Sequence, residues 1–265
     1  MINESQAYEA IEALRKSIGA VFIGKQHVID MTLVALLAGG HILLDDVPGV
    51  GKTLLGHALA KSLNASFSRI QFTSDLLPAD VIGADVYIQS TQTFQFVKGP
   101  IFANVVLADE VNRTPPRTQS ATLEAMSERQ VSTGGKTYTL PEPFLVVATE
   151  NPIEFEGTYP LPESQLDRFL MRLSIGYPDR DAELRMLETH GKGNALDALQ
   201  PVLSSQRALE LQQLTLQVRI DSEIADYMLA IVEATRSSAE IAVGASPRAS
   251  LAFARALRAW ALVNG

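Results

Sequence analysis

The sequence predicts an α/β domain, built on a parallel β-sheet with covering helices, and a smaller all-α domain after it. Three observations predict this fold. Before residue 178, short apolar segments typical of buried strands alternate with amphipathic helical segments. One of these apolar segments runs through a glycine-rich loop straight into a helix. After residue 178 the strand-like segments stop, so we divide the chain into an α/β core, residues 1–177, and a helical domain, residues 178–265.

The first elements form a strand–loop–helix–strand series. Apolar residues at helical spacing predict helices over residues 5–18, 25–38 and 51–63. Continuous apolar segments predict buried strands over residues 41–45 and 67–72. Because strands that alternate with helices usually pair in parallel, the series indicates a parallel sheet.

The rest of the core adds two β-hairpins and further strands. Alternation of apolar and polar residues about a polar turn predicts one hairpin over residues 84–98, and a Gly-Gly turn predicts another over residues 129–140. Further strands are expected over residues 104–110, 143–152 and 170–175. Helices are expected between them, over residues 117–126 and 162–169. The carboxyl ends of parallel strands meet at one edge of a sheet, where α/β proteins bind their ligands.

Two helices are predicted in the second domain. An apolar stripe between residues 224 and 232 predicts the first, with Asp221 as its N-cap. Ser246 and Pro247 are typical of a cap followed by a first-turn proline, and they open a final helix that reaches Val263.

Composition and charge exclude several classes of protein. Hydrophobic residues make up 46% of the chain, so a packed core is expected. The formal net charge of −8 disfavours general nucleic-acid binding, because an acidic surface repels phosphate backbones. The absence of cysteine excludes disulfides and thiolate metal sites. Neither a signal-peptide pattern nor an apolar stretch of membrane-spanning length is present, so a cytoplasmic protein without membrane insertion is expected.

The loop in LLDDVPGVGKT is expected to bind phosphate groups. Its glycines let backbone N–H groups approach phosphate oxygens closely, and the following helix N-terminus adds a positive end. Lys52 would neutralise phosphate charge, and the Thr53 hydroxyl would bind Mg²⁺. Nucleotide contacts are expected from Pro48, Gly49, Val50, Gly51, Lys52, Thr53 and Leu54.

One position departs from the general phosphate-loop pattern GxxxxGK[ST], because Asp46 stands where that pattern has glycine. A glycine-rich helix start that carries a surface lysine is the other interpretation of GVGKT. The apolar strand before the loop and the apolar helix after it favour the phosphate loop.

Polar groups end the next two buried strands of the predicted sheet. The first strand ends in Asp109 and Glu110, of which one can hold Mg²⁺ while the other orients or deprotonates a water molecule. Asn151 ends the second strand and is placed to hold the water or the γ-phosphate. In isolation, the two acids would be a solvated strand end and the Asn-Pro pair a common turn. Their position at the sheet edge that follows a phosphate loop favours a functional role.

Arginines near the end of the core and in the last helix admit two interpretations each. Arg168 follows Asp167 in a short predicted helix, so a local ion pair is its simplest interpretation, and Arg172 lies four residues on. Arg248 stands in the first turn of the final helix, where a cation opposes the helix dipole. A bound anion would explain that position, and a structural ion pair is the alternative.

Taken in order, the segments GVGKT, VVLADEVNR, ATENP, LPESQLDRF and GASPRA resemble the MoxR family of AAA+ ATPases. The resemblance extends from Phe22 to the end of the last helix. It implies a P-loop NTPase core with two hairpin inserts and a helical lid, ATP and Mg²⁺ as ligands, and hydrolysis of ATP to ADP and phosphate. It also implies a homo-oligomer, expected to be a hexameric ring, whose active sites are shared between neighbouring subunits.

The resemblance assigns roles to the residues that match the family's motifs. It implies a Walker A loop at Gly49, Gly51, Lys52 and Thr53, a Walker B pair at Asp109 and Glu110, and sensor 1 at Asn151. It implies that Arg168 is the arginine finger, which enters the next subunit's site. It implies that Arg248 is sensor 2, swung in from the lid.

Further positions match less specific parts of the family pattern. Ile23 and Gly24 match the stretch that usually lies near adenine. Gln71 or Thr73 matches the polar residue that couples partner binding to the catalytic carboxylate. Glu150 stands where many relatives carry glutamine, and an added carboxylate near phosphate would slow turnover.

The implied output is chaperone-like remodelling or maturation of a client protein, in some relatives one with a von Willebrand factor A domain. The two hairpins resemble inserts that face the ring's pore and touch partners, and decoration of the sheet edge is the alternative. Relatives continue with further lid helices, so the lid that ends at Gly265 is expected to be incomplete.

Other functions remain open at this point. A nucleotide-dependent switch with little hydrolysis is one, although Glu110 and Arg168 count against it. A chelatase-like or DNA-directed motor subunit is another, although the acidic charge counts against DNA. A GTPase is disfavoured because no NKxD motif occurs, and nothing indicates the acceptor pocket of a small-molecule kinase.

Overall fold

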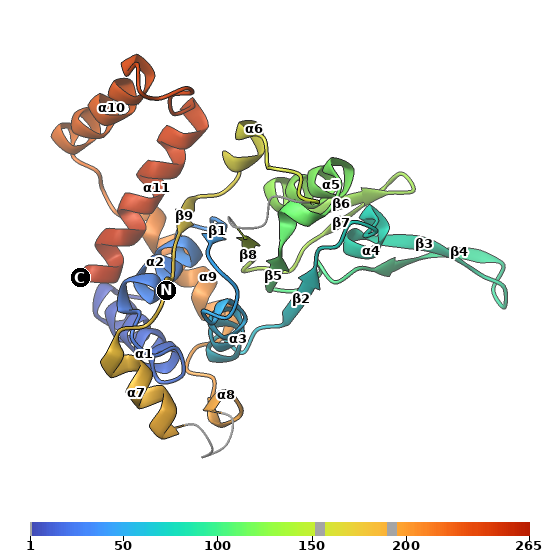
Figure 1. The fold of residues 1–265 in the computed structure, drawn as a ribbon, viewed down its shortest axis with the longest axis horizontal. Helices are drawn as coiled ribbons and strands as arrows, with labels where there is room; N and C mark the ends of the chain where they lie inside the picture. The colour runs from blue at the N-terminus through green and yellow to red at the C-terminus, as the bar shows by residue number, and fades with distance from the viewer. Residues whose placement is uncertain (1, 152–156, 190–194) are drawn as a thin grey trace.

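A five-stranded parallel sheet forms the centre of the computed structural model, which describes residues 2–151, 157–189 and 195–265. Its strand order is β2-β5-β8-β1-β9, and every pairing in it is parallel (Figure 1). The strands are β1 (Ile42–Asp45), β2 (Phe67–Gln71), β5 (Val105–Asp109), β8 (Leu145–Glu150) and β9 (Met171–Leu173). The predicted parallel α/β fold is therefore confirmed.

Alternate side chains along the strands enter two separate apolar clusters. In β5, Val105 and Leu107 face one cluster, and Val106 and Ala108 face the other. The same alternation occurs in β8, as expected for a strand whose successive side chains point to opposite faces. Both faces of the sheet are thus buried, which explains why its strands are continuous apolar runs in the sequence.

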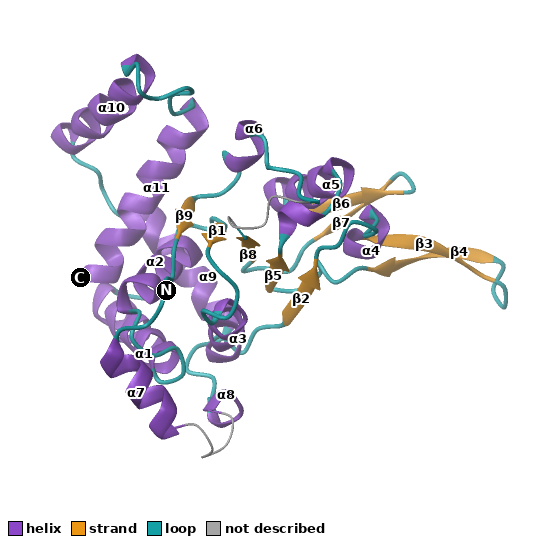
Figure 2. Ribbon diagram, in the orientation of Figure 1, coloured by secondary structure: helices purple, strands orange, loops and turns teal. Residues whose placement is uncertain are grey.

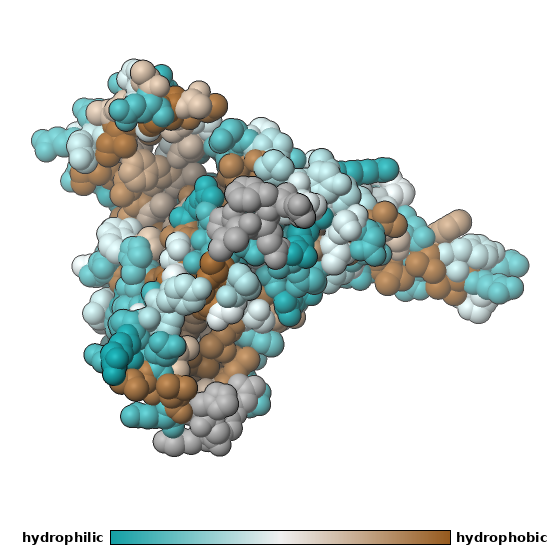
Figure 3. All heavy atoms as spheres, viewed as in Figure 1, coloured by the Kyte–Doolittle hydropathy of each residue, from teal (hydrophilic) through white to brown (hydrophobic). Residues whose placement is uncertain are grey.

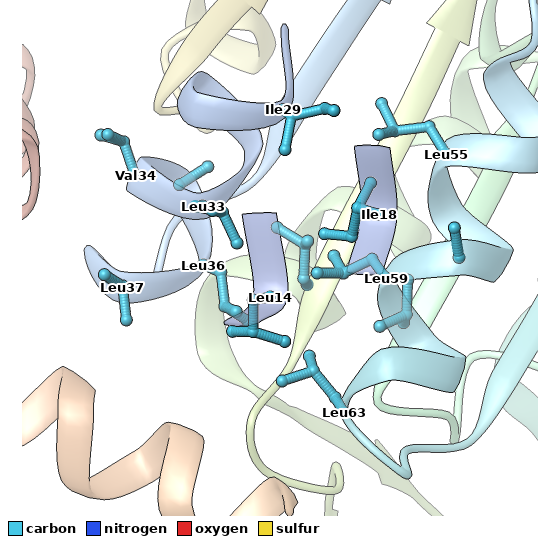
Figure 4. Close-up of a cluster of buried hydrophobic side chains, with 14 of the residues drawn as sticks. Leu14, Ile18, Ile29, Leu33, Val34, Leu36, Leu37, Leu55, Leu59 and Leu63 are labelled. Atoms are coloured by element: carbon cyan, nitrogen blue, oxygen red, sulfur yellow. The ribbon is translucent and has the colours of Figure 1, made fainter. Parts of the chain in front are cut away.

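The helices of the core cover these two faces. On one side lie α1 (Glu4–Gly19), α2 (Gln26–Leu37) and α3 (Lys52–Ser62), whose buried leucines and isoleucines interdigitate (Figure 4). On the other side lies α5 (Pro116–Glu128), with the short α4 (Pro78–Ile82) and the 3-10 turn Val111–Arg113. A final short helix, α6 (Glu163–Leu166), leads into β9.

Both predicted hairpins are present, outside the main sheet (Figure 2). The first consists of β3 (Gly83–Ile88) and β4 (Thr93–Lys98), and the second of β6 (Gln130–Thr133) and β7 (Lys136–Thr139). They touch each other, because the ring of Phe96 stacks on the ring of Tyr138 at a centroid distance of 4.2 Å. Apolar side chains remain exposed along the β3–β4 hairpin (Figure 3), among them Phe94, which is 72% exposed.

Every described element after β9 is a helix. These are α7 (Arg180–Thr189), α8 (Ala195–Ala198), α9 (Ser205–Gln217), α10 (Ser222–Ser237) and α11 (Pro247–Asn264). Ser246 caps α11 as predicted, since its hydroxyl accepts a hydrogen bond from the amide of Ala249. Asp221 occupies the N-cap position of α10, but its side chain makes no capping hydrogen bond.

The carboxyl-terminal helices do not pack as a separate body. Leu211 of α9 and Val263 of α11 are fully buried in the same cluster as α1 and α2. The division at residue 178 therefore marks where strands end rather than where the hydrophobic core ends, and a functional boundary there stays a prediction. No helix in the described ranges is both long and apolar enough to span a lipid bilayer.

Candidate functional site

Two adjoining cavities open at the carboxyl edge of the sheet, on either side of the loop between β1 and α3. The first, of about 410 Å³, holds the polar groups, and the second, of about 550 Å³, is mostly apolar. Gly49, Gly51 and Leu54 line both cavities. The remaining lining residues of the first are Pro48, Lys52, Thr53, Arg69, Gln71, Asp109, Glu110 and Asn151. The structure thus brings together, at one place, the side chains that end three different strands.

The loop needs glycine at two positions only. Gly49 has φ +86° and Gly51 has φ +96°, a region that residues with a Cβ rarely adopt. Gly51 is also the N-cap of α3, so the loop delivers the first amides of that helix to the cavity. Asp46 does not adopt a positive φ, which explains how an aspartate replaces the glycine of the general pattern.

Lys52 lies half-buried between the ends of β1 and β8. Its Nζ donates hydrogen bonds to the backbone oxygen of Asp46 at 2.6 Å and to that of Glu150 at 3.4 Å. Burial lowers the pKa of Lys52, and the carboxylates of Asp46, Asp109 and Glu110 oppose that shift. A cation whose hydrogen-bond acceptors are neutral carbonyls keeps its charge available for an anion that enters the cavity.

The Walker B candidates at the end of β5 are held by neighbouring strands. Thr149 is fully buried, and its hydroxyl donates to Asp109 Oδ1 at 2.7 Å while accepting the amide of Glu110 at 2.9 Å. Glu110 has φ +60° and ψ +50°, a left-handed conformation that costs a non-glycine residue about 1–3 kcal/mol. Because of this turn, the carboxylates of Asp109 and Glu110 point in different directions. The hydrogen bonds of the Thr149 hydroxyl stabilise the turn.

Side chains of β2 donate hydrogen bonds to the carboxylates of both Asp109 and Glu110. Gln71 donates to Glu110 Oε2 at 3.0 Å, and Arg69 donates to Asp109 Oδ2 at 2.6 Å. Arg69 also donates to the side-chain oxygen of Gln71, so the two β2 residues form one network with the acids. Thr73 instead bonds Asp75, and the geometry therefore favours Gln71 over Thr73 as the residue coupled to Glu110.

The donor set in the first cavity fits a magnesium ion. The Thr53 hydroxyl and the Asp109 carboxylate both line it, and such oxygen donors are those that Mg²⁺ prefers. Asn151 lines the same cavity and is buried. Glu150 does not line it, and burial raises the pKa of its carboxyl, which lies beside Arg172 and Asp45.

The second cavity has the size and character of a base pocket. Ile23 lines it together with Val50, Ile175 and Tyr177, and α7 closes its far side. Gly24 does not line the cavity. A Cβ on Gly24 would lie 2.5 Å from the Cβ of Ala182, so this glycine instead allows α7 to approach the wall. A pocket of mainly apolar residues with a few polar groups is typical of small-ligand sites.

The two predicted arginines lie elsewhere. Leu170 donates its amide to the carbonyl of His41, just before β1, so Arg168 sits near the amino end of that strand. The phosphate loop begins at the opposite, carboxyl end. Arg168 donates to Ser127 at 2.8 Å, and Arg248 donates to the same hydroxyl at 3.3 Å. Neither arginine lines either cavity, so the sensor 2 role of Arg248 stays a prediction.

Two further arginines extend this pair into a cationic cluster. Burial, together with the nearby charges of Arg129 and Arg248, lowers the pKa of Arg255. The Nε atoms of Arg168 and Arg255 are buried and have no hydrogen-bond partner. Within the described ranges, no carboxylate lies at ion-pair distance from Arg168, Arg248 or Arg255. Such a cluster has the chemistry of an anion-binding surface.

Sequence reasoning missed three residues of these sites. Arg69 interrupts the apolar strand FSRIQF, which was a readable signal of a polar role. Thr149 gave no signal, because threonine is ordinary in a buried strand. Arg255 lies seven residues after Arg248 on one helix, but only the packing of α11 places both beside α5.

Comparison with known proteins gives consistent results. Residues 41–171 match a family described as ATPases associated with various cellular activities, and residues 233–265 match an AAA lid domain. Over 93% of its length the chain is 50% identical to YeaC of Bacillus subtilis, a protein without an assigned function, and spans 77% of it. It is 44% identical to the chaperone MoxR1 of Mycobacterium tuberculosis, with 92% of this chain and 67% of that protein covered. A crystal structure of a candidate ATPase from Cytophaga hutchinsonii superposes with a TM-score of 0.88 at 41% identity, covering 98% of this chain and 82% of that one.

Proposed function

Because the chain belongs to the MoxR family of AAA+ ATPases, we propose that it binds ATP with Mg²⁺, hydrolyses it at a site shared between subunits, and remodels or matures a client protein. One observation carries this proposal. A single cavity gathers a glycine-rich helix start, a lysine, a hydroxyl, two carboxylates and an amide from different strands. That combination matches the needs of phosphoryl transfer.

Each group in the cavity has a distinct role in binding. The amides of the loop and the start of α3 hold the β- and γ-phosphates, and Lys52 compensates their charge. Thr53 and Asp109 would hold Mg²⁺, which supplies further charge stabilisation on the phosphates. A metal ion held by Asp109 Oδ2 would compete with the hydrogen bond that Arg69 donates to the same oxygen. The adjoining apolar cavity would take the adenosine. The phosphate loop lines both cavities, so one nucleotide can reach from one to the other.

Glu110 is the proposed general base. Its carboxylate is at the cavity wall, and Gln71 holds one of its oxygens at 3.0 Å. A general base must lie within hydrogen-bond reach of the water that it deprotonates. Asn151, which directly follows the neighbouring strand β8, would orient that water or the γ-phosphate. Contact of a client or neighbour with β2 would move Gln71 and so change the position of Glu110.

The hydroxyl of Thr149 is expected to matter for this geometry. Thr149→Val removes both the donor to Asp109 and the acceptor for the amide of Glu110, so kcat should fall about tenfold and unfolding free energy by about 1–3 kcal/mol. Thr149→Ser keeps the hydroxyl and should retain most of kcat. Steady-state kinetics and urea unfolding check both variants, and a serine variant as slow as the valine variant would contradict the role.

Arg168 and Arg248 lie away from the phosphate loop of their own subunit. The four residues of β1 separate them from the phosphate loop by about 13 Å of strand. Figure 1 shows α6, which precedes Arg168, well apart from α3. We therefore infer that both arginines act on the nucleotide of the next subunit, in a ring that the family resemblance suggests is hexameric. The guanidinium groups of Arg168, Arg248 and Arg255, which have no carboxylate partner among the described residues, support this inference.

The client is proposed to contact the two hairpins. These hairpins touch each other, and hydrophobic surface lies along the β3–β4 hairpin (Figure 3). The exposed side chains of this hairpin include those of Tyr87 and Phe94. Exposed apolar side chains are typical of surfaces that bind other proteins. The name of the relative from Mycobacterium tuberculosis, chaperone MoxR1, supports a client protein, and a client with a von Willebrand factor A domain is part of the proposal.

Calorimetric titration of ATP and Mg²⁺ tests the binding step. Lys52→Met should weaken ATP binding by about 10- to 150-fold, because a charge-assisted contact with phosphate is lost. Lys61→Met is the matched control, since Lys61 lies in the last turn of the same helix and donates hydrogen bonds to the carbonyls of residues 196 and 197, away from both cavities. Absence of heat with folded wild-type protein, or equal affinity of Lys52→Met and wild type, would refute the proposed site.

A further inference from the structure

Asp46 is a buried carboxylate inside the phosphate loop. It is only 6% exposed, and both of its oxygens accept hydrogen bonds from one segment across the sheet edge. The amide of Ile175 donates to Oδ2, and the amide of Gly176 donates to Oδ1 at 3.0 Å. The hydroxyl of Ser174 also donates to Oδ1, at 3.1 Å. These bonds satisfy the buried charge, as such a charge requires.

The segment that Asp46 holds forms a wall of the apolar cavity. Ile175, Gly176, Tyr177 and Pro178 line that cavity, and the chain then enters α7, whose side chains line it further. The phosphate loop lines the same cavity from the other side. Asp46 is thus a direct hydrogen-bonded connection between the proposed adenosine wall and the phosphate loop.

The backbone of Asp46 faces the phosphate side. Its carbonyl accepts the ammonium of Lys52 at 2.6 Å, while its carboxylate is directed at residues 174–176. A carboxylate beside a polyphosphate is unfavourable in itself, since like charges repel. Its presence in the loop therefore calls for a compensating role, and neither phosphate binding nor a special backbone conformation supplies one.

We propose that Asp46 is a positioning residue that keeps the adenosine wall in register with the phosphate loop. The inference rests on the proposed ATP site and extends it. With Asp46 intact, the base and the triphosphate bind as one ligand to two surfaces held at a fixed separation. Without it, residues 174–178 and α7 lose their attachment to the loop, and the adenosine contributes less to affinity.

The experiment compares ATP with inorganic tripolyphosphate, both with Mg²⁺, by calorimetric titration. Asp46→Asn replaces one accepting oxygen with an NH₂ group that opposes the amide donors. ATP affinity should fall about tenfold, whereas tripolyphosphate affinity should not fall, because the loop keeps its glycines and Lys52. Asp45→Asn is the matched control. Asp45 is the adjacent carboxylate; it pairs with Arg172, and the hydrogen bonds from residues 174–176 go to Asp46 instead. Asp45→Asn should therefore leave the ratio of ATP affinity to tripolyphosphate affinity at its wild-type value.

Three outcomes would overturn the proposal. If Asp46→Asn lowered the affinities for ATP and tripolyphosphate equally, Asp46 would act through the phosphate loop alone. If it left ATP affinity unchanged, Asp46 would not connect the adenosine wall to the phosphate loop. If Asp45→Asn lowered ATP affinity as selectively, the cause would be the loss of a negative charge near the phosphate loop rather than the bonds of Asp46. If Asp46→Asn does not fold, Ser174→Ala removes one donor and leaves the carboxylate, and it should lower ATP affinity selectively but less. Wild-type protein that binds neither ligand would instead refute the proposed function itself.

Discussion

Replacing Glu110 with glutamine is expected to slow ATP hydrolysis by roughly 100- to 10,000-fold while leaving ATP binding intact, because the general base is lost and the phosphate loop with Lys52 is kept. Glutamine has the same shape, and its amide oxygen can still accept the hydrogen bond from Gln71. The left-handed turn at this residue and its amide bond to Thr149 do not depend on the carboxylate. Phosphate release measures turnover, and calorimetry measures binding.

A carboxylate outside the cavities provides the control for this change. Glu124 is exposed on α5, so Glu124→Gln should hydrolyse ATP at the wild-type rate. Equal rates for wild type and Glu110→Gln would contradict the proposed chemistry. That result would favour the alternative in which the protein is a nucleotide-dependent switch with little hydrolysis.

The sequence predicted those parts of the site that local pattern encodes. Lys52 and Thr53 follow a glycine-rich loop, and Asp109, Glu110 and Asn151 each end an apolar strand, so parallel pairing alone brings them to one edge. The hairpins were predictable for the same reason, since alternation and turn residues are local signals.

The remaining parts depend on register and on tertiary packing. Gln71 could be preferred to Thr73 only once the pairing of β2 with β5 placed it opposite Asp109. The contact of Arg248 with Ser127 depends on how α11 lies against the core, which no local pattern encodes. The helix α9 was not placed from the sequence, and its burial against α2 and α11 is a tertiary contact.

The placement of the arginine cluster has a consequence for assembly. An isolated subunit holds the phosphate loop and the two acids at the carboxyl edge of the sheet, and the arginine cluster near the amino end of β1. When a neighbouring subunit binds ATP, its nucleotide phosphates would neutralise these arginines. The arginines would in turn complete the active site of that neighbour. Binding of ATP and association of subunits should therefore favour each other, since the phosphates bound by one subunit and the arginines of the next compensate each other's charge.

Arg168→Ala should bind ATP normally and lose turnover by roughly 1,000-fold or more, the magnitude typical of a missing arginine finger. Binding is preserved because Arg168 lines neither cavity of its own subunit. Arg172→Ala is the matched control, since Arg172 lies four residues away, pairs with Asp45 and also lines neither cavity. It should retain most of the wild-type rate.

Mixing two inactive variants distinguishes a shared site from a local defect. In a ring that contains Arg168→Ala and Glu110→Gln subunits, some interfaces combine Glu110 of the first variant with Arg168 of the second. Those interfaces are complete, so the mixture should hydrolyse ATP faster than either variant alone, and fastest near equal proportions. The gain requires that the arginine and the base belong to different chains, which is what we expect from Arg168 near the amino end of β1 and Glu110 at the carboxyl edge of the sheet. A mixture no faster than its components would show that catalysis is not shared between subunits.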